Sequence, residues 1–330
     1  MTGASTAYVV AGKYRENRAY VWSIGPEATV RRLPSVPYVR KLAPNGSGVV
    51  WGDKPCLGTS DGTVPQVVCF QDEAWQPQGL PDSLAGWAIQ NMEVTDGNLV
   101  VLLINPLVPN QSLIAAKQGD KWAEPIPGPP ISDGILYLGS DVAGSRVLVG
   151  TVSPTRRAVW SLAADGSWRS VAASPWKGLV NQNSGPVATK TNYLFSRTDI
   201  KGRTWPFAID GARIQPSDRL SQTTKSPLSR SKRRAQGRLV LLQGRPWAIW
   251  QEGRPLSDRQ GESTTVYAAA LSARGVPTRR SRVAHFARLT WPCSLDVLRV
   301  GNRTFAVVTA SVGLSRQRTR VRMYPLPEPK

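Results

Sequence analysis

The chain lacks several features that define common classes of protein. Its longest apolar runs, such as residues 99–104, are far too short to span a bilayer, so no membrane span is expected. One histidine and three cysteines exclude a zinc site by number and spacing. Neither GxGxxG nor GxxxxGK(S/T) occurs, which excludes the commonest dinucleotide and phosphate loops. We therefore expect no metal and no cofactor.

Catalytic groups are equally scarce. His285 lies in the apolar segment 283–287, a setting that favours a structural role, and no nucleophile motif accompanies it. Residues 166–330 contain only 8 Asp and Glu, so the paired carboxylates of a glycosidase cannot be identified. We assign no catalytic residue and expect a non-enzymatic protein. If the chain is an enzyme, the class that fits is a glycoside hydrolase or lyase.

The three cysteines leave the cellular compartment open. Cys56 and Cys69 flank the hairpin 57–68, and we predict a disulfide between them. That bond would indicate an oxidising compartment and a secreted or cell-surface mature protein. The alternative is two unpaired thiols, which leaves a cytoplasmic location open. Cys293 is expected to be a buried thiol. No basic segment followed by an apolar core opens the chain, so a signal peptide is either absent or already removed.

The most informative feature of the chain is a repeat of about 46 residues. A shift of 46 brings Trp168 onto Trp122, a shift of 45 brings Trp160 onto Trp205, and three repeats separate Trp160 from Trp22. Each repeat consists of short apolar strands separated by turn residues. A repeat of this length and content is typical of a β-propeller. We therefore predict an all-β fold in a single domain, residues 1–330.

We label the strands of one blade a, b, c and d, from the centre to the rim. Counting the incomplete ends as one blade each gives seven blades of up to four antiparallel strands, and sharing strands between the ends would give six. The predicted strands are 8–12, 20–24 and 29–33; 38–42, 48–52, 66–70 and from 75; 87–94, 98–104, 112–117 and from 122; 135–140, 146–151, 158–162 and 168–171; near 187, 193–197, 204–209 and 212–215; 238–242, 247–251, 265–271 and 276–281; and 295–300, 305–310 and 320–324.

Tryptophan opens strand d in three successive blades, at Trp75, Trp122 and Trp168. This regular spacing favours packing between neighbouring blades, and the alternative is a set of ligand platforms. Because strand direction alternates, the b–c loops and d–a links share one end of a blade. The long insertions 53–65, 219–237 and 253–263 all belong to that end, which indicates a binding face.

The charge is strongly uneven. The net charge is +20, with 13 Lys and Arg against 14 Asp and Glu in residues 1–165, and 29 against 8 in residues 166–330. We predict a basic inter-blade loop at 219–237 and a positive face that attracts polyanions. The alternative is a solvated charge run with no ligand. The predicted ligand-binding residues are Arg230, Lys232, Arg233, Arg234, Arg238, Arg254 and Arg259, with Trp247 as a ring for a sugar.

Residues 196–205 read Ser-Arg-Thr-Asp-Ile-Lys-Gly-Arg-Thr-Trp, with one extra residue before Asp199 and another before Gly202 relative to the motif Ser-x-Asp-x-Gly-x-Thr-Trp. This segment resembles the Asp box of sialidase-like propellers. The resemblance implies a propeller and, in that family, three arginines on a substrate carboxylate with a Tyr/Glu pair and an acid Asp. No residue of this chain can be matched to that catalytic set.

The sequence thus predicts a lectin-like propeller that binds an acidic glycan or another polyanion. Nucleic acid is an alternative polyanion. A sialidase-like glycoside hydrolase and a protein-interaction scaffold are the alternative functions, because propellers carry many unrelated activities.

Overall fold

A computed structural model describes strands and turns from both halves of the chain. In the described residues the only helical element is the short turn η2, Asp82–Leu84. Side chains are described for a smaller set, which omits residues 171–244. The described residues are 6–13, 18–25, 27, 29–37, 41–42, 48–60, 64–108, 110–129, 135–140, 147–152, 156–163, 165–175, 187–188, 192–198, 204–210, 221–222, 235–242, 245–255, 262–272, 280–289, 294–312 and 318–326.

The described strands form seven sheets, and the chain divides into two compact units. The first unit is Met1–Thr151 with Trp160–Ser170, and the second is Val152–Val159 with Val171–Lys330. The predicted all-β fold is confirmed. The number of blades and the single domain stay predictions.

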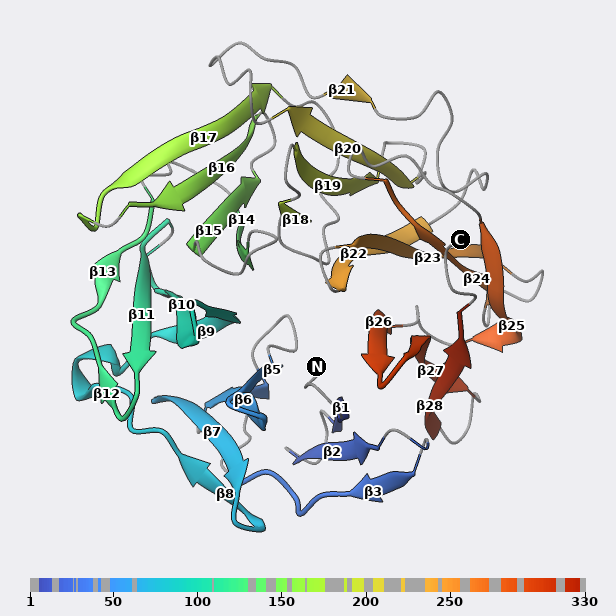
Figure 1. Ribbon diagram of the computed structural model, residues 1–330, viewed down its shortest axis with the longest axis horizontal. Helices are drawn as coiled ribbons and strands as arrows, with labels where there is room; N and C mark the ends of the chain where they lie inside the picture. Colours follow the sequence, from blue (N-terminus) through green and yellow to red (C-terminus); the bar gives the residue numbers. More distant parts are fainter. Residues whose placement is uncertain are drawn as a thin grey trace. The chain divides into compact units, whose positions relative to one another are not determined.

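Three sheets belong wholly to the first unit, and Figure 1 labels their strands apart from β4. Their strand orders are β1-β2-β3, then β4-β6-β7-β8 with β5 also on β6, then β12-β11-β10-β9 with β13 also on β11. The strands are β1 (Ala7–Lys13), β2 (Arg18–Ile24), β3 (Val30–Arg32), β4 (Lys41–Leu42), β5 (Gly48–Trp51), β6 (Lys54–Ser60), β7 (Pro65–Gln71), β8 (Ala74–Pro77), β9 (Ala88–Thr95), β10 (Asn98–Ile104), β11 (Ser112–Gln118), β12 (Lys121–Trp122) and β13 (Ile126–Pro127).

A fourth sheet, β14-β15-β16-β17, contains residues of both units, and three sheets belong to the second unit. The second unit's strand orders are β18-β19-β20-β21, β22-β23-β24-β25 and β26-β27-β28. The strands are β14 (Ile135–Ser140), β15 (Val147–Val152), β16 (Arg156–Leu162), β17 (Trp168–Pro175), β18 (Val187–Ala188), β19 (Asn192–Thr198), β20 (Thr204–Asp210), β21 (Ser221–Gln222), β22 (Ala235–Leu242), β23 (Arg245–Pro255), β24 (Glu262–Ala270), β25 (Ser281–Leu289), β26 (Ser294–Val300), β27 (Arg303–Val312) and β28 (Arg318–Pro325).

The middles of two inner strands of the first unit, β6 and β10, are covered on both faces. The five central residues of β6 and of β10 are all buried. On β10, Val101 belongs to a core cluster with residues of the preceding sheet, such as Val67, while Leu102 packs with Leu138 of the following sheet. The buried middles of these strands show no alternation of polar and apolar residues, as expected for strands that are covered on both faces.

The tryptophans that open strand d pack between neighbouring sheets, as predicted. The indole Nε1–H of Trp75 donates to the carbonyl of Pro34 at 2.9 Å, and that of Trp168 donates to the carbonyl of Pro127 at 2.8 Å. Trp122 makes the same bond with Gln78, also at 2.8 Å. Each acceptor lies at or just beyond the outer strands of the preceding sheet. This repeated bond ties the outer edges of successive sheets together, and it takes up the polar atom of each indole.

The second sheet corrects the predicted strand pattern. The range 53–65, predicted as a long loop, contains the whole of β6, which follows β5 through a tight two-residue turn at Gly52 and Asp53 with φ of 54° and 63°. The prediction failed because Pro55 and Gly58 resemble loop residues. Gly58 is required by packing, since a Cβ there would lie 2.8 Å from Cγ2 of Ile89 in the next sheet.

Two predicted d strands also differ from the structure. In the fifth repeat the range 212–215 lies outside the described residues, and β21 at Ser221–Gln222 pairs with β20 instead. In the sixth repeat the range 276–281 was predicted, whereas β25 occupies Ser281–Leu289. The bounds of β25 were predicted wrongly because it is an edge strand with charged residues, and its register with β24 shifts twice. The predicted strands of the third and fourth repeats and of both ends correspond to observed strands with small changes at their bounds.

Candidate functional site

Most of the predicted basic residues lie outside the described part of the chain. Arg230, Lys232, Arg233, Arg234 and Arg259 fall in ranges that are not described. The backbone of two others is described, with Arg238 on β22 opposite Ile249 and Arg254 on β23 opposite Ser263. Of the predicted loop 219–237, residues 221–222 form β21 and residues 235–237 begin β22.

Trp247, the predicted sugar platform, is buried. It is 5% exposed and belongs to the core that β22–β25 form with β26–β28. Trp250, three residues along β23, is 1% exposed. The core therefore takes up the ring of Trp247, and no exposed face of it is left for a sugar.

A cluster of aromatic and charged side chains surrounds Trp250. Trp250 and Tyr267 are paired on β23 and β24, and their rings stack at 5.8 Å with an angle of 26°. The guanidinium of Arg280 lies 3.5 Å above the centre of the Tyr267 ring. One carboxylate oxygen of Glu252 accepts bonds from Arg280 Nη2 at 3.0 Å and from Trp250 Nε1 at 3.2 Å. Arg280 is thus held by a ring and a carboxylate together, with its side chain 31% exposed.

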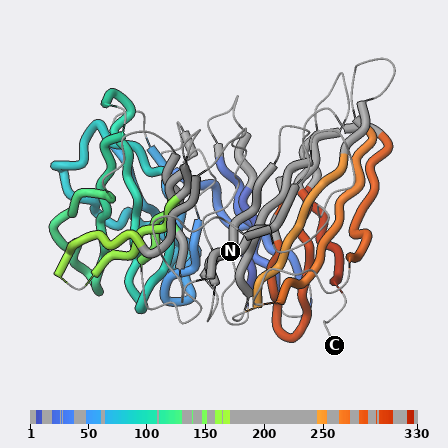
Figure 2. Tube along the Cα trace, turned by 90° about the horizontal axis from the view of Figure 1, so that it is seen from above, coloured from blue at the N-terminus to red at the C-terminus, as the bar shows by residue number. Residues whose placement is uncertain are grey.

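Strand β25 continues this cluster to the edge of the sheet. Arg282 is paired with Tyr267 and is exposed. His285 is paired with Thr265 and exposed, and its Nδ1 lies 3.0 Å from the Thr265 hydroxyl. Sequence reasoning placed His285 inside an apolar segment, and the structure puts its side chain at the surface instead. We call Arg280, Arg282 and His285 the β25 edge cluster. In Figure 2 the orange trace of β23–β25 runs in successive antiparallel passes.

The described arginines of the second unit are not confined to the predicted b–c end. Arg245 and Arg303 follow the a–b turns of their sheets, and both are exposed. Arg280 follows the c–d connection, which shares that end of the sheet. The segment that resembles an Asp box spans the β19–β20 hairpin, with Thr198 opposite Thr204 and residues 199–203 outside the described part. The described positive charge therefore includes the end opposite the b–c loops.

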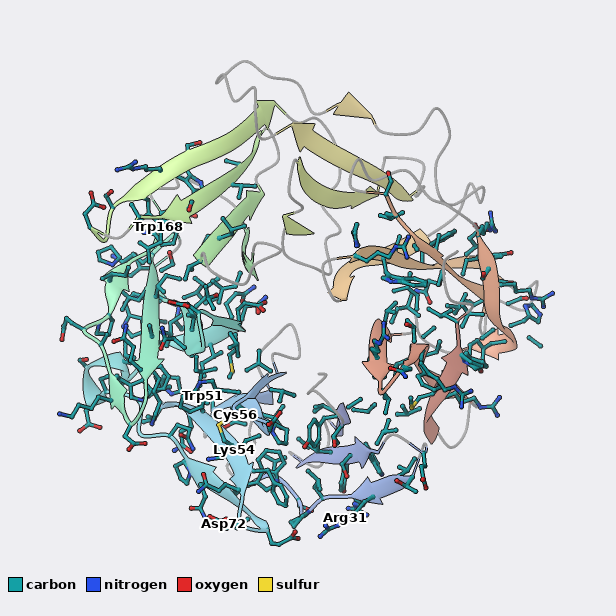
Figure 3. All side chains as sticks on the ribbon, in the orientation of Figure 1. Arg31, Trp51, Lys54, Cys56, Asp72 and Trp168 are labelled. Atoms are coloured by element: carbon teal, nitrogen blue, oxygen red, sulfur yellow. A yellow bond between two sulfur atoms is a disulfide. The ribbon has the colours of Figure 1, made fainter. Side chains whose placement is uncertain are left out.

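The first unit contains the disulfide. Cys56 on β6 and Cys69 on β7 are directly opposite each other and joined by a bond, and both are buried. Figure 3 shows Cys56 beside the labelled Trp51 and Lys54. The bond is compatible with an extracellular location.

Metal binding and membrane insertion are the two alternatives on which the described residues bear. Among them, no group of three or more His, Cys, Asp or Glu side chains is placed to hold a metal ion. No helix in the same part of the chain is long and apolar enough to cross a membrane.

No family model matches the chain, and no curated protein matches it at a significant level. Solved structures do resemble it. A prolyl endopeptidase structure matches 98% of this chain with a TM-score of 0.52 and 12% identity. The Dos1 propeller matches 96% with a TM-score of 0.51 and 10% identity. A protein from Lactobacillus plantarum matches 98% with a TM-score of 0.55 and 9% identity.

The fold is a β-propeller. The match covers 97% of the Lactobacillus plantarum protein and 75% of the Dos1 propeller. It covers 51% of the prolyl endopeptidase, so this chain spans about half the length of that protein. At these sequence identities the likeness shows the fold alone. Any ligand has to be inferred from the residues of this chain.

Proposed function

We propose that this propeller is a non-enzymatic binding protein that recognises an acidic glycan through the basic surface of its C-terminal half. The charge distribution carries the proposal. Residues 166–330 have a net charge of +21, whereas residues 1–165 have a net charge of −1. A surplus of this size attracts sulfate and carboxylate groups and speeds their encounter with the protein.

The described packing does not account for the surplus. The core of the second unit consists of apolar side chains, such as Ile249, Val266 and Val308. Like charges repel one another and destabilise a compact chain. The arginines therefore need another explanation, and a ligand of opposite charge supplies one.

The proposed contacts are the arginines and lysine of the inter-blade link, with further arginines on β22, at the end of β23 and in the segment between β23 and β24. Their planar guanidinium groups suit sulfate and carboxylate, which accept two parallel hydrogen bonds. Trp247 is left out of this set because it is buried. The set is Arg230, Lys232, Arg233, Arg234, Arg238, Arg254 and Arg259.

The disulfide favours a glycan over nucleic acid. A buried Cys56–Cys69 bond is expected in a protein that folds in an oxidising compartment, where secreted proteins meet acidic glycans. A reduced pair in the native protein would instead favour duplex DNA or RNA as the polyanion.

The test is binding of the full chain to a heparin oligosaccharide, with duplex DNA and neutral dextran as competitors, at low and high salt. We expect tight binding to heparin that weakens steeply with salt, because neutralised anionic groups release counterions. Preference for DNA would replace the glycan by nucleic acid. Salt-independent binding to dextran, or no binding to either polyanion, would refute the proposal.

A variant with Gln at Arg230, Lys232, Arg233 and Arg234 should lose most of this affinity. Its matched control carries Gln at Arg31, Arg32, Lys121 and Arg169, four exposed cations of the first unit. Both variants lose the same net charge. Equal losses of affinity would show that total charge, and not the link, attracts the ligand.

One observation favours the second candidate, a protein-interaction scaffold. The β10–β11 loop presents Leu107 and Val108, which are 86% and 42% exposed. The side-chain oxygen of Asn105 accepts both of their backbone N–H groups, at 2.9 and 3.2 Å. These two bonds hold the backbone of Leu107 and Val108 in a turn, which lowers the entropy cost of a contact made by these side chains. A protein partner that is retained by the fourfold Gln variant of the first unit and lost by Leu107→Ser would support this function.

A further inference from the structure

The β25 edge cluster has the properties of an anion site. It lies on a sheet whose strands are in direct register from Gly237 through Trp250 and Tyr267 to Arg282. Side chains that face each other across neighbouring strands lie on the same face. The aromatic pair thus continues outward into an exposed arginine, on the last strand of the sheet.

Arg280 is fixed in place before any ligand binds. The Cζ atom of its guanidinium lies 3.5 Å from the centre of the Tyr267 ring. Its Nη2 donates a hydrogen bond to Oε1 of Glu252 at 3.0 Å. A stacked guanidinium loses less conformational entropy when it forms further hydrogen bonds. The Arg280 side chain is 31% exposed, so a ligand can reach part of it.

The charges around Arg280 favour an anion over a cation. Arg282 is exposed beside Tyr267, and the exposed His285 adds a ring nitrogen two pairs further along β24 and β25. Among the described side chains, the carboxylate that contacts this cluster is that of Glu252, and its side chain is only 14% exposed. The two exposed arginines are therefore hydrogen-bond donors that give this edge a net positive charge.

We infer that Arg280, Arg282 and His285 form a second contact point, which binds one sulfate or carboxylate group of the acidic glycan at the outer edge of the β22–β25 sheet. The inference rests on the proposed function and adds a site that the b–c loops do not include. Arg280 lies at the end of the β24–β25 connection, whereas Arg254 lies near the end of β23 and Arg259 belongs to the opposite connection, between β23 and β24. A glycan that reaches both ends would lie along the outer edge of the sheet.

Three single substitutions test the site, because they should move the affinity for a heparin oligosaccharide in opposite directions. Arg282→Gln should weaken binding roughly tenfold, as expected for the loss of a charged hydrogen bond, and should lower the salt dependence by about one ion. His285→Gln should weaken it less. Glu252→Gln should strengthen binding, since it removes the competing charge while its amide oxygen still accepts the Trp250 N–H. The control is Arg31→Gln, an exposed arginine of the first unit, which should bind like the unaltered chain.

Arg280 needs a design that keeps the fold. Arg280→Lys retains the charge and loses the planar stack, so its affinity should fall by a similar factor. If Arg280→Gln fails to fold because Glu252 loses its cation, the double variant with Glu252→Gln removes both charges together.

The outcomes separate this site from the proposed function. If the unaltered chain binds heparin and Arg282→Gln, Arg280→Lys and Glu252→Gln leave the affinity unchanged, the site is refuted and the proposed function stands. If the unaltered chain binds no acidic glycan, the proposed function is refuted, and titration with inorganic sulfate then decides the site. Sulfate-dependent shifts of the Arg280 and Arg282 side-chain NMR signals would retain an anion site, and their absence would overturn it.

Discussion

Reducing the Cys56–Cys69 bond should destabilise the first unit by an amount that its geometry sets. The two cysteines are 13 residues apart in sequence, and both are buried in the core between the second and third sheets. Closing a loop of this size removes conformational entropy from the unfolded chain worth about 3 kcal/mol at 25 °C. Because β6 and β7 also form a ladder of five residue pairs, which includes the two cysteines, the native sheet should survive reduction.

The corresponding shift in melting temperature depends on how the chain unfolds. If all 330 residues unfold in one transition, the loss of about 3 kcal/mol lowers Tm by about 4 °C. If the two units unfold separately, the transition of the first unit should shift by about twice as much, and that of the second unit should not shift.

Differential scanning calorimetry of the oxidised chain, and of chain reduced in denaturant and refolded with reductant, measures this shift. Reduction isolates the loop closure, whereas substitution also leaves a cavity where the sulfur atoms were. The double variant Cys56→Ala and Cys69→Ala is the control, and reductant should not change its Tm. Equal Tm values for the oxidised and reduced wild-type chain would refute the reasoning, since the loop would then be constrained without the bond.

Three further predictions concern packing and buried charge. Gly58→Ala should lower the free energy of unfolding by about 1–3 kcal/mol in urea titrations, because its Cβ would crowd Ile89, and an unchanged midpoint would contradict this close approach. Trp122→Phe removes one N–H donor between sheets and should cost about 1–2 kcal/mol, whereas no loss would mean that this bond is dispensable. Burial lowers the pKa of Lys117, with Asp120 acting in the opposite sense, so the folded chain binds this proton less tightly than the unfolded chain. The free energy of unfolding should therefore rise with pH between the lowered pKa and the ordinary lysine value, and Lys117→Met should remove that rise.

The repeat made most of the strands predictable. Trp75, Trp122 and Trp168 recur at nearly constant spacing, and the structure gives them the same indole bond to the preceding sheet. A periodic contact leaves a periodic residue, so it can be identified without coordinates. Strand β6 could not be identified in this way, because its Gly58 is explained only by a residue of another sheet.

The β25 edge cluster shows why the candidate site was missed. Its signals in the sequence are weak. Trp250 and Glu252 are two residues apart on β23, and Arg280 and Arg282 are two residues apart at and just before the start of β25. Neither spacing is a recognisable motif. What joins them is the register of β23, β24 and β25, which contains two shifts that no pattern of residue types specifies. Charge runs such as residues 230–234 stand out in a sequence, whereas an arginine fixed by a ring and a carboxylate stands out only in three dimensions.

The two proposed contact regions differ in how they would bind. The cations of the link lie close together along the chain, at residues 230–234. Their attraction for the glycan depends on charge density and is weakened by salt. Arg280 is held by the Tyr267 ring and by Glu252, so its remaining hydrogen-bond donors have preferred directions. A diffuse positive charge has no such directional preference. Specificity among acidic glycans should therefore depend on the β25 edge cluster more than on the link, even where the link contributes more of the total affinity. On this argument Arg280→Lys should narrow the difference in affinity between differently sulfated oligosaccharides, whereas neutralising the link should weaken binding to all of them by a similar factor.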